Sequence, residues 1–211
     1  AGPGVWHSCY RGSFLFTFAI ALMNTWHRWI GTWGKTVTAY IASTQFYKGL
    51  FVRHGLPENK IHVKQHMVAR DPGVGAGEGD YALFIGRLDP EKGAMTLIQA
   101  WKELKARGVV CPLKIRGDGQ MRTAMQQVID ENVLTDVSFV DKMSREGLFE
   151  LMKGARFLVW PSHGYYETFG LVAFESYACG RPVIASNIGV LAEHVKDKET
   201  GLLFAPGDPA D

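Results

Sequence analysis

The sequence predicts an α/β fold built around a doubly wound parallel sheet, and three observations support this prediction. From residue 81 onward, short apolar strands alternate with helices of about ten residues, a pattern typical of right-handed crossovers. The strands read as continuous apolar runs such as ALFI and FLVW, as expected for strands covered on both faces. The composition, 46% hydrophobic and 21% charged, is that of a globular chain with a buried core.

The regular part of the chain supplies the elements of this sheet. We expect strands at residues 81–85, 113–116, 137–140, 157–160 and 183–185. Between and after them we expect helices at residues 95–107, 121–131, 145–153 and 170–178, followed by a last short helix. In open sheets of this kind ligands bind beyond the carboxyl ends of the strands, so the loops after the strands are the places to look for function.

The residues before this region are less regular. They predict a helix over 13–30, a strand over 36–42, a helix over 43–54 and a strand over 61–67. Gly55 and Pro57 end the second helix. Residues 69–80 contain glycines and a proline without apolar periodicity, so we expect a flexible connection or domain boundary there.

Composition also excludes several classes of function. The 23 Lys and Arg residues nearly balance the 21 Asp and Glu residues, so nothing in the overall charge favours nucleic acid as a partner. The three cysteines, at 9, 111 and 179, are far apart, and we interpret them as buried thiols in a reducing compartment. The apolar stretch 14–23 is too short to span a bilayer, which takes about 20 residues. We interpret the Trp and Phe residues between 6 and 33 as core residues, with a partner or membrane surface as the alternative.

The loop after the first regular strand, residues 86–93, carries Arg87 and Lys92 at the start of a helix. Free backbone amides and the helix dipole favour an anion at such a position. The loop therefore has the outline of a diphosphate clamp. The alternative is that both are ordinary solvated charges.

The loop after the fourth strand contains a second candidate anion site. Thr168 is a plausible N-cap, which would leave the amides of Phe169, Gly170 and Leu171 without helical partners. Glu175 lies in an otherwise apolar helix, where an unpaired carboxylate is costly. Its partner is either a pair of sugar hydroxyls or an internal cation, and spacing alone does not separate the two.

Glu167 and Glu175 enclose seven residues, and this spacing belongs to a wider pattern. The stretch ETFGLVAFESYACGRPVIAS resembles the E-x7-E signature of retaining glycosyltransferases of family 4, which have the GT-B fold. GRLDPEKG resembles the diphosphate loop of the same family, and IRGDGQ, IGVLAEHV and TGLLFAPGD follow in the family's order. Two positions depart from the family pattern: Val190 replaces a glycine, and His66 stands where asparagine is frequent.

The resemblance implies a role for each candidate residue. Arg87 and Lys92 would hold the diphosphate of a nucleotide sugar, Glu175 its ribose, and Glu167 the hydroxyls of the donor sugar. The loop of Thr168, with the amides of Phe169, Gly170 and Leu171, would contact sugar and phosphate, and Lys142 would lie near the base.

The resemblance also implies a domain organisation. Residues 81–211 would form a Rossmann-like donor-binding domain, truncated at its C-terminal end. Residues 1–68 would be a remnant of the acceptor-side domain, joined through 69–80, with the rest of the N-terminal domain missing. We expect such a chain to bind donor without transferring sugar, and to self-associate through its aromatic N-terminal residues.

The expected activity is that of a metal-independent hexosyltransferase. The sequence contains no Asp-x-Asp pair, and Arg87 and Lys92 would already neutralise the charge of the diphosphate. No cofactor is expected beyond the nucleotide-sugar substrate. The acceptor would be a glycan or a lipid-linked molecule, and the protein would be cytoplasmic, with the inner face of a membrane as an alternative location. A GT-B phosphorylase or epimerase, or a nucleotide-sugar binding module without turnover, remain as alternatives.

Overall fold

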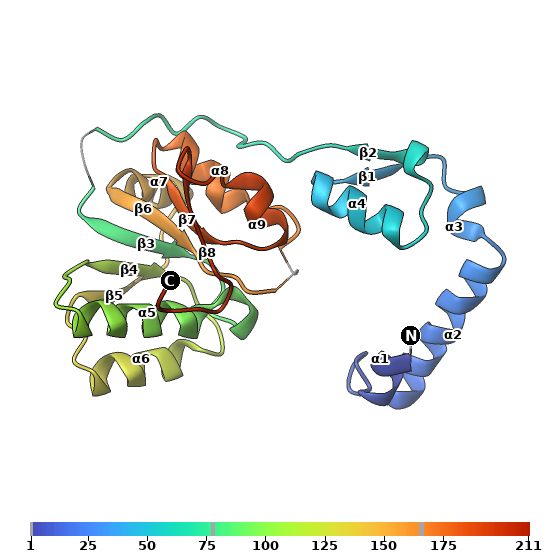
Figure 1. Ribbon diagram of the computed structural model, residues 1–211, viewed down its shortest axis with the longest axis horizontal. Coiled ribbons are helices and arrows are strands. Elements are labelled where there is room, and N and C mark those ends of the chain that lie inside the picture. The colour runs from blue at the N-terminus through green and yellow to red at the C-terminus, as the bar shows by residue number, and fades with distance from the viewer. Residues whose placement is uncertain (1, 77–78, 165–166) are drawn as a thin grey trace. The chain divides into compact units, whose positions relative to one another are not determined.

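The computed structural model describes residues 2–76, 79–164 and 167–211. The chain divides into two compact units, residues 1–64 and 65–211 (Figure 1). The larger unit contains the regular strands and helices predicted above. Each unit is described separately below.

The larger unit is built on a parallel sheet of six strands in the order β5-β4-β3-β6-β7-β8. Neighbouring strands pair in parallel throughout, and Leu83 of β3 stands opposite both Lys114 of β4 and Leu158 of β6. The predicted doubly wound sheet is therefore confirmed. The strands are β3 (Tyr81–Ile85), β4 (Leu113–Arg116), β5 (Val137–Val140), β6 (Ala155–Trp160), β7 (Val183–Ser186) and β8 (Gly201–Phe204).

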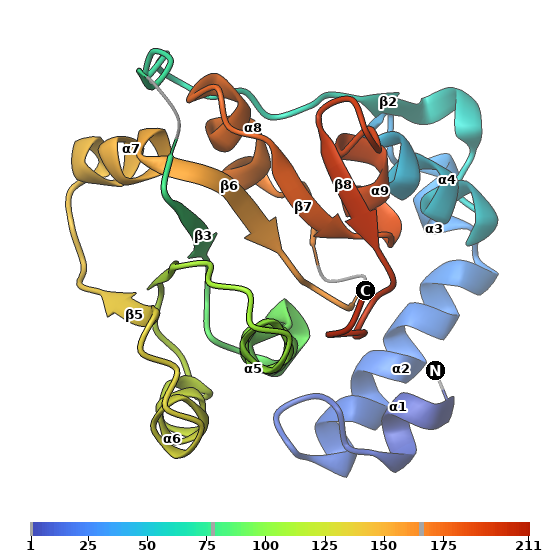
Figure 2. The same cartoon turned by 60° about the vertical axis from the view of Figure 1, so that its left-hand side comes forward.

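Helices cover both faces of this sheet, as Figures 1 and 2 show. One face carries α5 (Ala94–Ala106) and α6 (Arg122–Glu131), and the opposite face carries α7 (Arg145–Lys153), α8 (Leu171–Ala178) and α9 (Gly189–His194). A short 3-10 turn, η2 (Pro90–Lys92), precedes α5. The chain changes face between β5 and β6, so β3 and β6 lie side by side with their connections running to opposite sides. This is the switch point at which ligands bind in such sheets.

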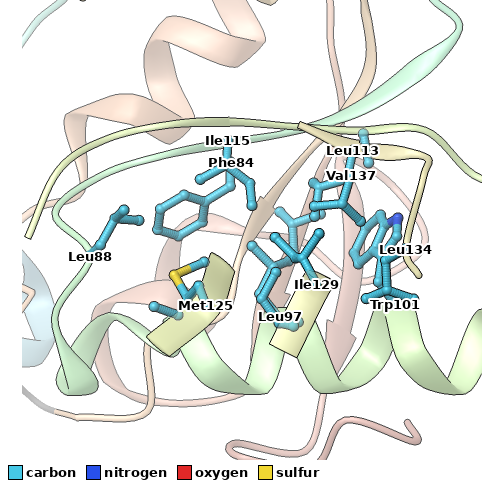
Figure 3. Packing of buried hydrophobic residues seen from close by; sticks show 14 residues of the cluster. Phe84, Leu88, Leu97, Trp101, Leu113, Ile115, Met125, Ile129, Leu134 and Val137 are labelled. Atoms are coloured by element: carbon cyan, nitrogen blue, oxygen red, sulfur yellow. The ribbon is translucent and has the colours of Figure 1, made fainter. Parts of the chain in front are cut away.

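The main hydrophobic core lies between the sheet and helices α5 and α6 (Figure 3). Phe84 and Ile115 from the strands meet Leu97 and Met125 from the helices, and all four are almost completely buried. Trp101 packs in the same core, and its Nε1 donates to the carbonyl of Cys111 at 2.6 Å. This packing fixes β3 and α5, and with them the loop that joins the two.

The smaller unit has little regular structure beyond its helices. Its two short strands, β1 (Tyr40–Ala42) and β2 (Ile61–Val63), form a parallel pair that is shorter at both positions than predicted. Ser13 caps α2 by accepting from the amide of Phe16, and Thr44 caps α4 by accepting from Tyr47. Its helices are α1 (Gly2–Trp6), α2 (Phe14–Trp29), α3 (Thr32–Lys35) and α4 (Gln45–Arg53), with a 3-10 turn η1 (Glu58–Lys60).

The aromatic face of α2 is exposed, which contradicts our interpretation of these residues as core. Phe14, Phe18, Trp26 and Trp29 expose between 48% and 78% of their surface. The two-stranded sheet of this unit is too small to cover a helix of 16 residues.

The cysteines also differ from our expectation of three buried thiols. Cys9 is exposed and Cys111 is half-buried, so only Cys179 is fully buried. None of the described helices is long and apolar enough to cross a membrane.

The glycine-rich segment 69–80, which we expected to connect two domains, belongs to the larger unit and contacts the rest of it closely. The amide of Gly75 donates to the carbonyl of Cys179 at 3.1 Å. A Cβ at Gly79 would overlap the backbone of Ala155, so glycine allows the close approach. Residues 77–78 of the predicted connection lie outside the described residues.

Candidate functional site

Two loops meet at the switch point of the sheet, one after β3 and one after β6. Gly93, which ends η2 with a φ of +70°, packs so closely on Pro161 that a Cβ would overlap the Pro161 carbonyl. The amide of His163 donates to the carbonyl of Glu91 at 3.2 Å. Sequence positions some 70 residues apart are thereby held against each other at the carboxyl edge of the sheet.

The loop after β4 supports the first of these loops from its other side. The amide of Leu88 donates to the carbonyl of Asp118 at 2.9 Å, and the amide of Met121 donates back to the carbonyl of Leu88 at 2.8 Å. Leu88 itself is fully buried. The backbone around Arg87 is therefore fixed before any ligand binds.

Lys92 and Glu167 form an ion pair between the two loops. Both side chains are mostly buried, at 18% and 14% exposed. The Glu167 Oε1 atom also accepts from Trp160 Nε1 and from Ser162 Oγ, each at 3.2 Å. Three donors thus converge on one carboxylate oxygen. Among the described residues nothing donates to Oε2, which leaves that oxygen for a ligand.

Arg87 lies in the same loop but in a different environment. Its side chain is 67% exposed and pairs with Asp89 and Glu91 of its own loop, the latter at 3.3 Å. The structure therefore brings Lys92 to Glu167, while Arg87 stays at the exposed surface beside its own carboxylate partners. A ligand would have to compete with these two carboxylates for Arg87.

The helix after the second loop begins at Leu171, with Gly170 as its N-cap in the left-handed conformation. Our assignment of Thr168 as the N-cap is therefore wrong by two residues. Gly170 has a φ of +77°, outside the helical range, so the helix begins only after it, and a Cβ at this position would overlap the indole ring of Trp160. No acceptor among the described residues takes the amide hydrogens of Gly170 and Leu171, so the start of α8 keeps the donors expected of an anion site.

Phe169 anchors this loop through its ring. The ring is buried and stacks on Phe174 at 4.8 Å between centroids, with the edges of His66 and His194 at 5.0 and 4.9 Å. Burial lowers the pKa of His194, opposed by the nearby Glu193 and by a hydrogen bond to the backbone of Phe169. His66, one of the two residues that depart from the family pattern, thus packs directly against the ring that anchors this loop.

Glu175 is buried one turn into α8, and its partner is Arg145. Arg145 Nη2 donates to Glu175 Oε1 at 2.6 Å, and the Arg145 side chain is 54% exposed. Burial raises the pKa of Glu175, and the Arg145 charge and hydrogen bond act against that rise. The internal cation of our two alternatives is therefore present, and it occupies only one of the two carboxylate oxygens.

Lys142 lies in the exposed loop between the edge strand β5 and helix α7. Within the described ranges Lys142 forms no hydrogen bond or ion pair. No group of three or more His, Cys, Asp or Glu side chains that could hold a metal ion occurs in the parts of the chain that the structure describes. The candidate site is therefore made of Arg87, Lys92, Glu167 and the start of α8, with Glu175 and Arg145 beside it.

Sequence reasoning missed three side chains of this arrangement: Trp160, Ser162 and Arg145. Trp160 ends β6 and Ser162 follows it, so both stand at a strand end where polar groups gather. Arg145 is the first residue of a helix after β5. Their positions after strands could have identified all three as candidate site residues. Their contacts with Glu167 and Glu175, however, depend on tertiary packing.

Comparison with known proteins gives a consistent result. The family model of glycosyl transferases group 1 matches residues 70–211. The chain is 39% identical over 143 residues to the glycogen synthase of Mycobacterium tuberculosis, covering 67% of this chain and 33% of that protein. It is 36% identical over 136 residues to an uncharacterized glycosyltransferase of Methanocaldococcus jannaschii, covering 64% of this chain and 37% of that protein.

Solved structures show the same fold. The crystal structure of HepE from Anabaena in complex with UDP and glucose matches with a TM-score of 0.71 and 21% identity, over 82% of this chain and 51% of that chain. Sucrose-phosphate synthase from Thermosynechococcus elongatus matches with a TM-score of 0.68 and 28% identity, over 80% of this chain and 45% of that chain. The larger unit therefore has the fold of GT-B glycosyltransferase structures. The chain spans about a third of the length of these curated relatives and about half of the length of these solved chains.

Proposed function

The chain belongs to the glycosyl transferases group 1 family, and we propose that it binds a nucleoside diphosphate sugar for transfer to an acceptor hydroxyl with retention of the anomeric configuration. One observation carries this proposal. Lys92 and Glu167, from two loops far apart in sequence, meet at the switch point beside the unpaired amides at the start of α8. A cation, a carboxylate and free amides at one edge suit a ligand with both phosphates and hydroxyls.

Cations and amides of the site would bind the diphosphate of the ligand, and carboxylates would bind its hydroxyls. Lys92 and the amides of Gly170 and Leu171 would supply positive potential for the diphosphate, and Arg87 would add a further cation from the exposed surface. Glu167 has its Oε2 free to accept from hydroxyls of the donor sugar. Glu175 would accept from the ribose, and Lys142 would lie near the base, as the family resemblance implies. HepE from Anabaena was solved with UDP-glucose and with UDP, which supports a nucleotide sugar as ligand.

For this ligand to bind, Lys92 must turn from Glu167 to the diphosphate. When Lys92 turns to the diphosphate, Glu167 Oε1 keeps its hydrogen bonds from Trp160 and Ser162. The buried carboxylate is therefore never left without donors, which would be expensive. Ligand binding exchanges one charged partner of Lys92 for another.

Catalysis would follow from the same charges. The bond between the anomeric carbon and the diphosphate breaks while a bond to the acceptor oxygen forms, and negative charge gathers on the departing phosphate. Lys92 and the α8 amides, fixed before the reaction, stabilise that charge as it develops. The acceptor proton leaves with the phosphate group. This scheme needs no metal ion, because Lys92, Arg87 and the α8 amides would balance the charge of the leaving group once Lys92 has turned to it.

We further propose that residues 81–211 form the donor-binding domain and residues 1–68 part of the acceptor-side domain, joined through 69–80. The acceptor platform would then lie largely on other sequence. Positioning two substrates can lower a barrier by as much as about 7–11 kcal/mol, so transfer by the 211-residue chain alone should be immeasurably slow.

The deciding experiment is isothermal titration of the 211-residue chain with UDP-glucose, ADP-glucose, GDP-mannose and the free nucleotides, with and without EDTA. We expect one nucleotide series to bind, and chelation to leave its affinity unchanged. Loss of binding on chelation would contradict the metal-independent scheme. The absence of any binding would refute the donor site itself. Sugar release to inorganic phosphate, or epimerisation without acceptor, would favour a phosphorylase or an epimerase instead.

A further inference from the structure

The contact between Arg145 and Glu175 is strongly asymmetric. The Glu175 side chain is 9% exposed, on a helix whose neighbouring Ala173 and Ser176 are also buried, whereas the Arg145 side chain is 54% exposed. A buried acid with a cation reaching down from the surface differs from an ordinary surface ion pair. The cation retains free donors at the surface, and the acid depends on that single partner among the described residues.

Arg145 is held in place by its own helix. It is the first residue of α7, where Ser144 caps the helix by accepting from the amide of Gly147 at 3.1 Å. Its guanidinium lies 5.3 Å from the centre of the Phe149 ring one turn later. The backbone and the stem of Arg145 are therefore fixed, which lets the guanidinium fix its partner.

The position of the pair links two strand-end loops. Helix α7 follows the loop after β5, and α8 follows the loop after β6, so both helices begin at the carboxyl edge of the sheet. The two helices pack against each other. Arg145 thus joins the loop expected to lie near the base to the helix whose start is expected to bind phosphate.

We propose that Arg145 is a positioning residue, which occupies Oε1 of Glu175 and thereby orients Oε2 toward the ribose hydroxyls of the nucleotide. This inference rests on the donor-binding function proposed above. Arg145 would act on the ribose through Glu175, so its contribution should disappear when Glu175 can no longer serve as a carboxylate.

Electrostatics give this role a pH signature. Burial disfavours the ionised form of Glu175, and Arg145 is the group that counteracts it. Among the described residues, the Cys179 thiol also interacts electrostatically with Glu175, and burial raises the pKa of this thiol. Without Arg145, Glu175 should therefore take up a proton at a higher pH than in the unmodified chain. As the pH is lowered, the nucleotide affinity of the variant should begin to fall at a higher pH than that of the unmodified chain.

The test measures nucleotide affinity by titration calorimetry between pH 5.5 and 8.5, with whichever of UDP, ADP and GDP the unmodified chain binds most tightly. Arg145→Gln should weaken binding roughly tenfold at neutral pH, and more at acidic pH, as expected for loss of a charge-assisted contact. Arg145→Lys should recover most of the affinity. Arg156→Gln, which removes an exposed arginine of β6, serves as the matched control and should change nothing.

The double variant Arg145→Gln/Glu175→Gln decides between positioning and direct contact. If Arg145 acts through Glu175, the double variant binds as weakly as Glu175→Gln alone. If the double variant instead binds about tenfold more weakly than Glu175→Gln alone, Arg145 contacts the nucleotide itself. That result would overturn the proposal. Unchanged affinity in Arg145→Gln, with normal binding by the unmodified chain, would overturn the Arg145 role alone. No nucleotide binding by the unmodified chain would refute the proposed function, and this role with it.

Discussion

Glu167 and Glu175 come from one short motif, yet the fold satisfies them in different ways. Glu167 lies in a loop, and one of its oxygens accepts from three donors, of which only Lys92 is charged. Glu175 lies in a helix, and within the described parts of the chain its one cationic partner is Arg145. The first carboxylate can lose its cation and remain hydrogen-bonded, whereas the second cannot.

This difference separates two tasks that the spacing of the motif alone does not distinguish. A carboxylate backed by neutral donors suits a place where a cation must move to a ligand and return. A buried carboxylate with one fixed cation suits a place where orientation must not change. Four substitutions test this distinction, beginning with the largest expected effect.

Gly170→Ala should damage the Glu167 half of the site most severely. The new Cβ would overlap the Trp160 indole, which donates to Glu167, and the φ of +77° is strained for alanine. Strain and overlap together should lower the free energy of unfolding by about 2–5 kcal/mol, measured by thermal or urea denaturation. Gly207→Ala is the control, because Gly207 has the same φ and open space around it. Equal effects at the two positions would contradict the role assigned to the Trp160 contact.

Lys92→Ala should weaken binding of the nucleotide sugar roughly tenfold to a hundredfold, the worth of a hydrogen bond to a charged group. The melting temperature should change little, because Trp160 and Ser162 still donate to Glu167. Titration calorimetry and a thermal melt measure the two quantities. Lys102→Ala on the exposed side of α5 should leave both unchanged. A collapse in stability with affinity preserved would make Lys92 a structural residue.

Glu175→Gln should reduce nucleotide affinity about tenfold without lowering the melting temperature at neutral pH. The pKa of Glu175 is raised in the folded state, so its protonated form stabilises the fold below the ordinary glutamate pKa, and this contribution is lost as the pH rises through the raised value. The ionised carboxylate is therefore a burden at neutral pH, and the amide removes it. In melting curves from pH 4 to pH 8, the melting temperature of Glu175→Gln should rise relative to that of the unmodified chain as the pH increases. A large drop in melting temperature with normal affinity would mean that the ion pair is purely structural.

Arg87→Ala should have the smallest effect, a loss in affinity of roughly two- to fivefold, as for an exposed charge pair. Arg87 is 67% exposed and already engaged by Asp89 and Glu91, so a ligand gains little by recruiting it. The loss should shrink further in high salt, which screens exposed charges. A loss as large as that of Lys92→Ala would show that Arg87 leaves its carboxylates and enters the site.

Much of the fold could be predicted because local pattern determines it. Strands β3, β4 and β5 and helix α7 begin and end at the predicted residues, since the local pattern of apolar residues and the turn or capping residues at their ends define each of them. Strand β8 was missed, because GLLF is a short run whose strand character depends on pairing with β7. The aromatic face of α2 shows the opposite limit, since amphipathic spacing predicts a helix but cannot supply the surface that would cover it.

In the candidate site, too, local sequence determines some features and tertiary packing determines others. The sequence by itself placed Arg87, Lys92, Glu167 and Glu175 at strand ends and early helix turns, because strand ends in a parallel sheet share one edge. Only the tertiary structure decided which cation faces which carboxylate. Lys92 meets Glu167 across 75 residues and Arg145 meets Glu175 across 30, and both contacts depend on how neighbouring loops and helices pack. Periodicity and spacing describe what each segment does alone, whereas an ion pair between segments is set by distances that only the packed sheet creates.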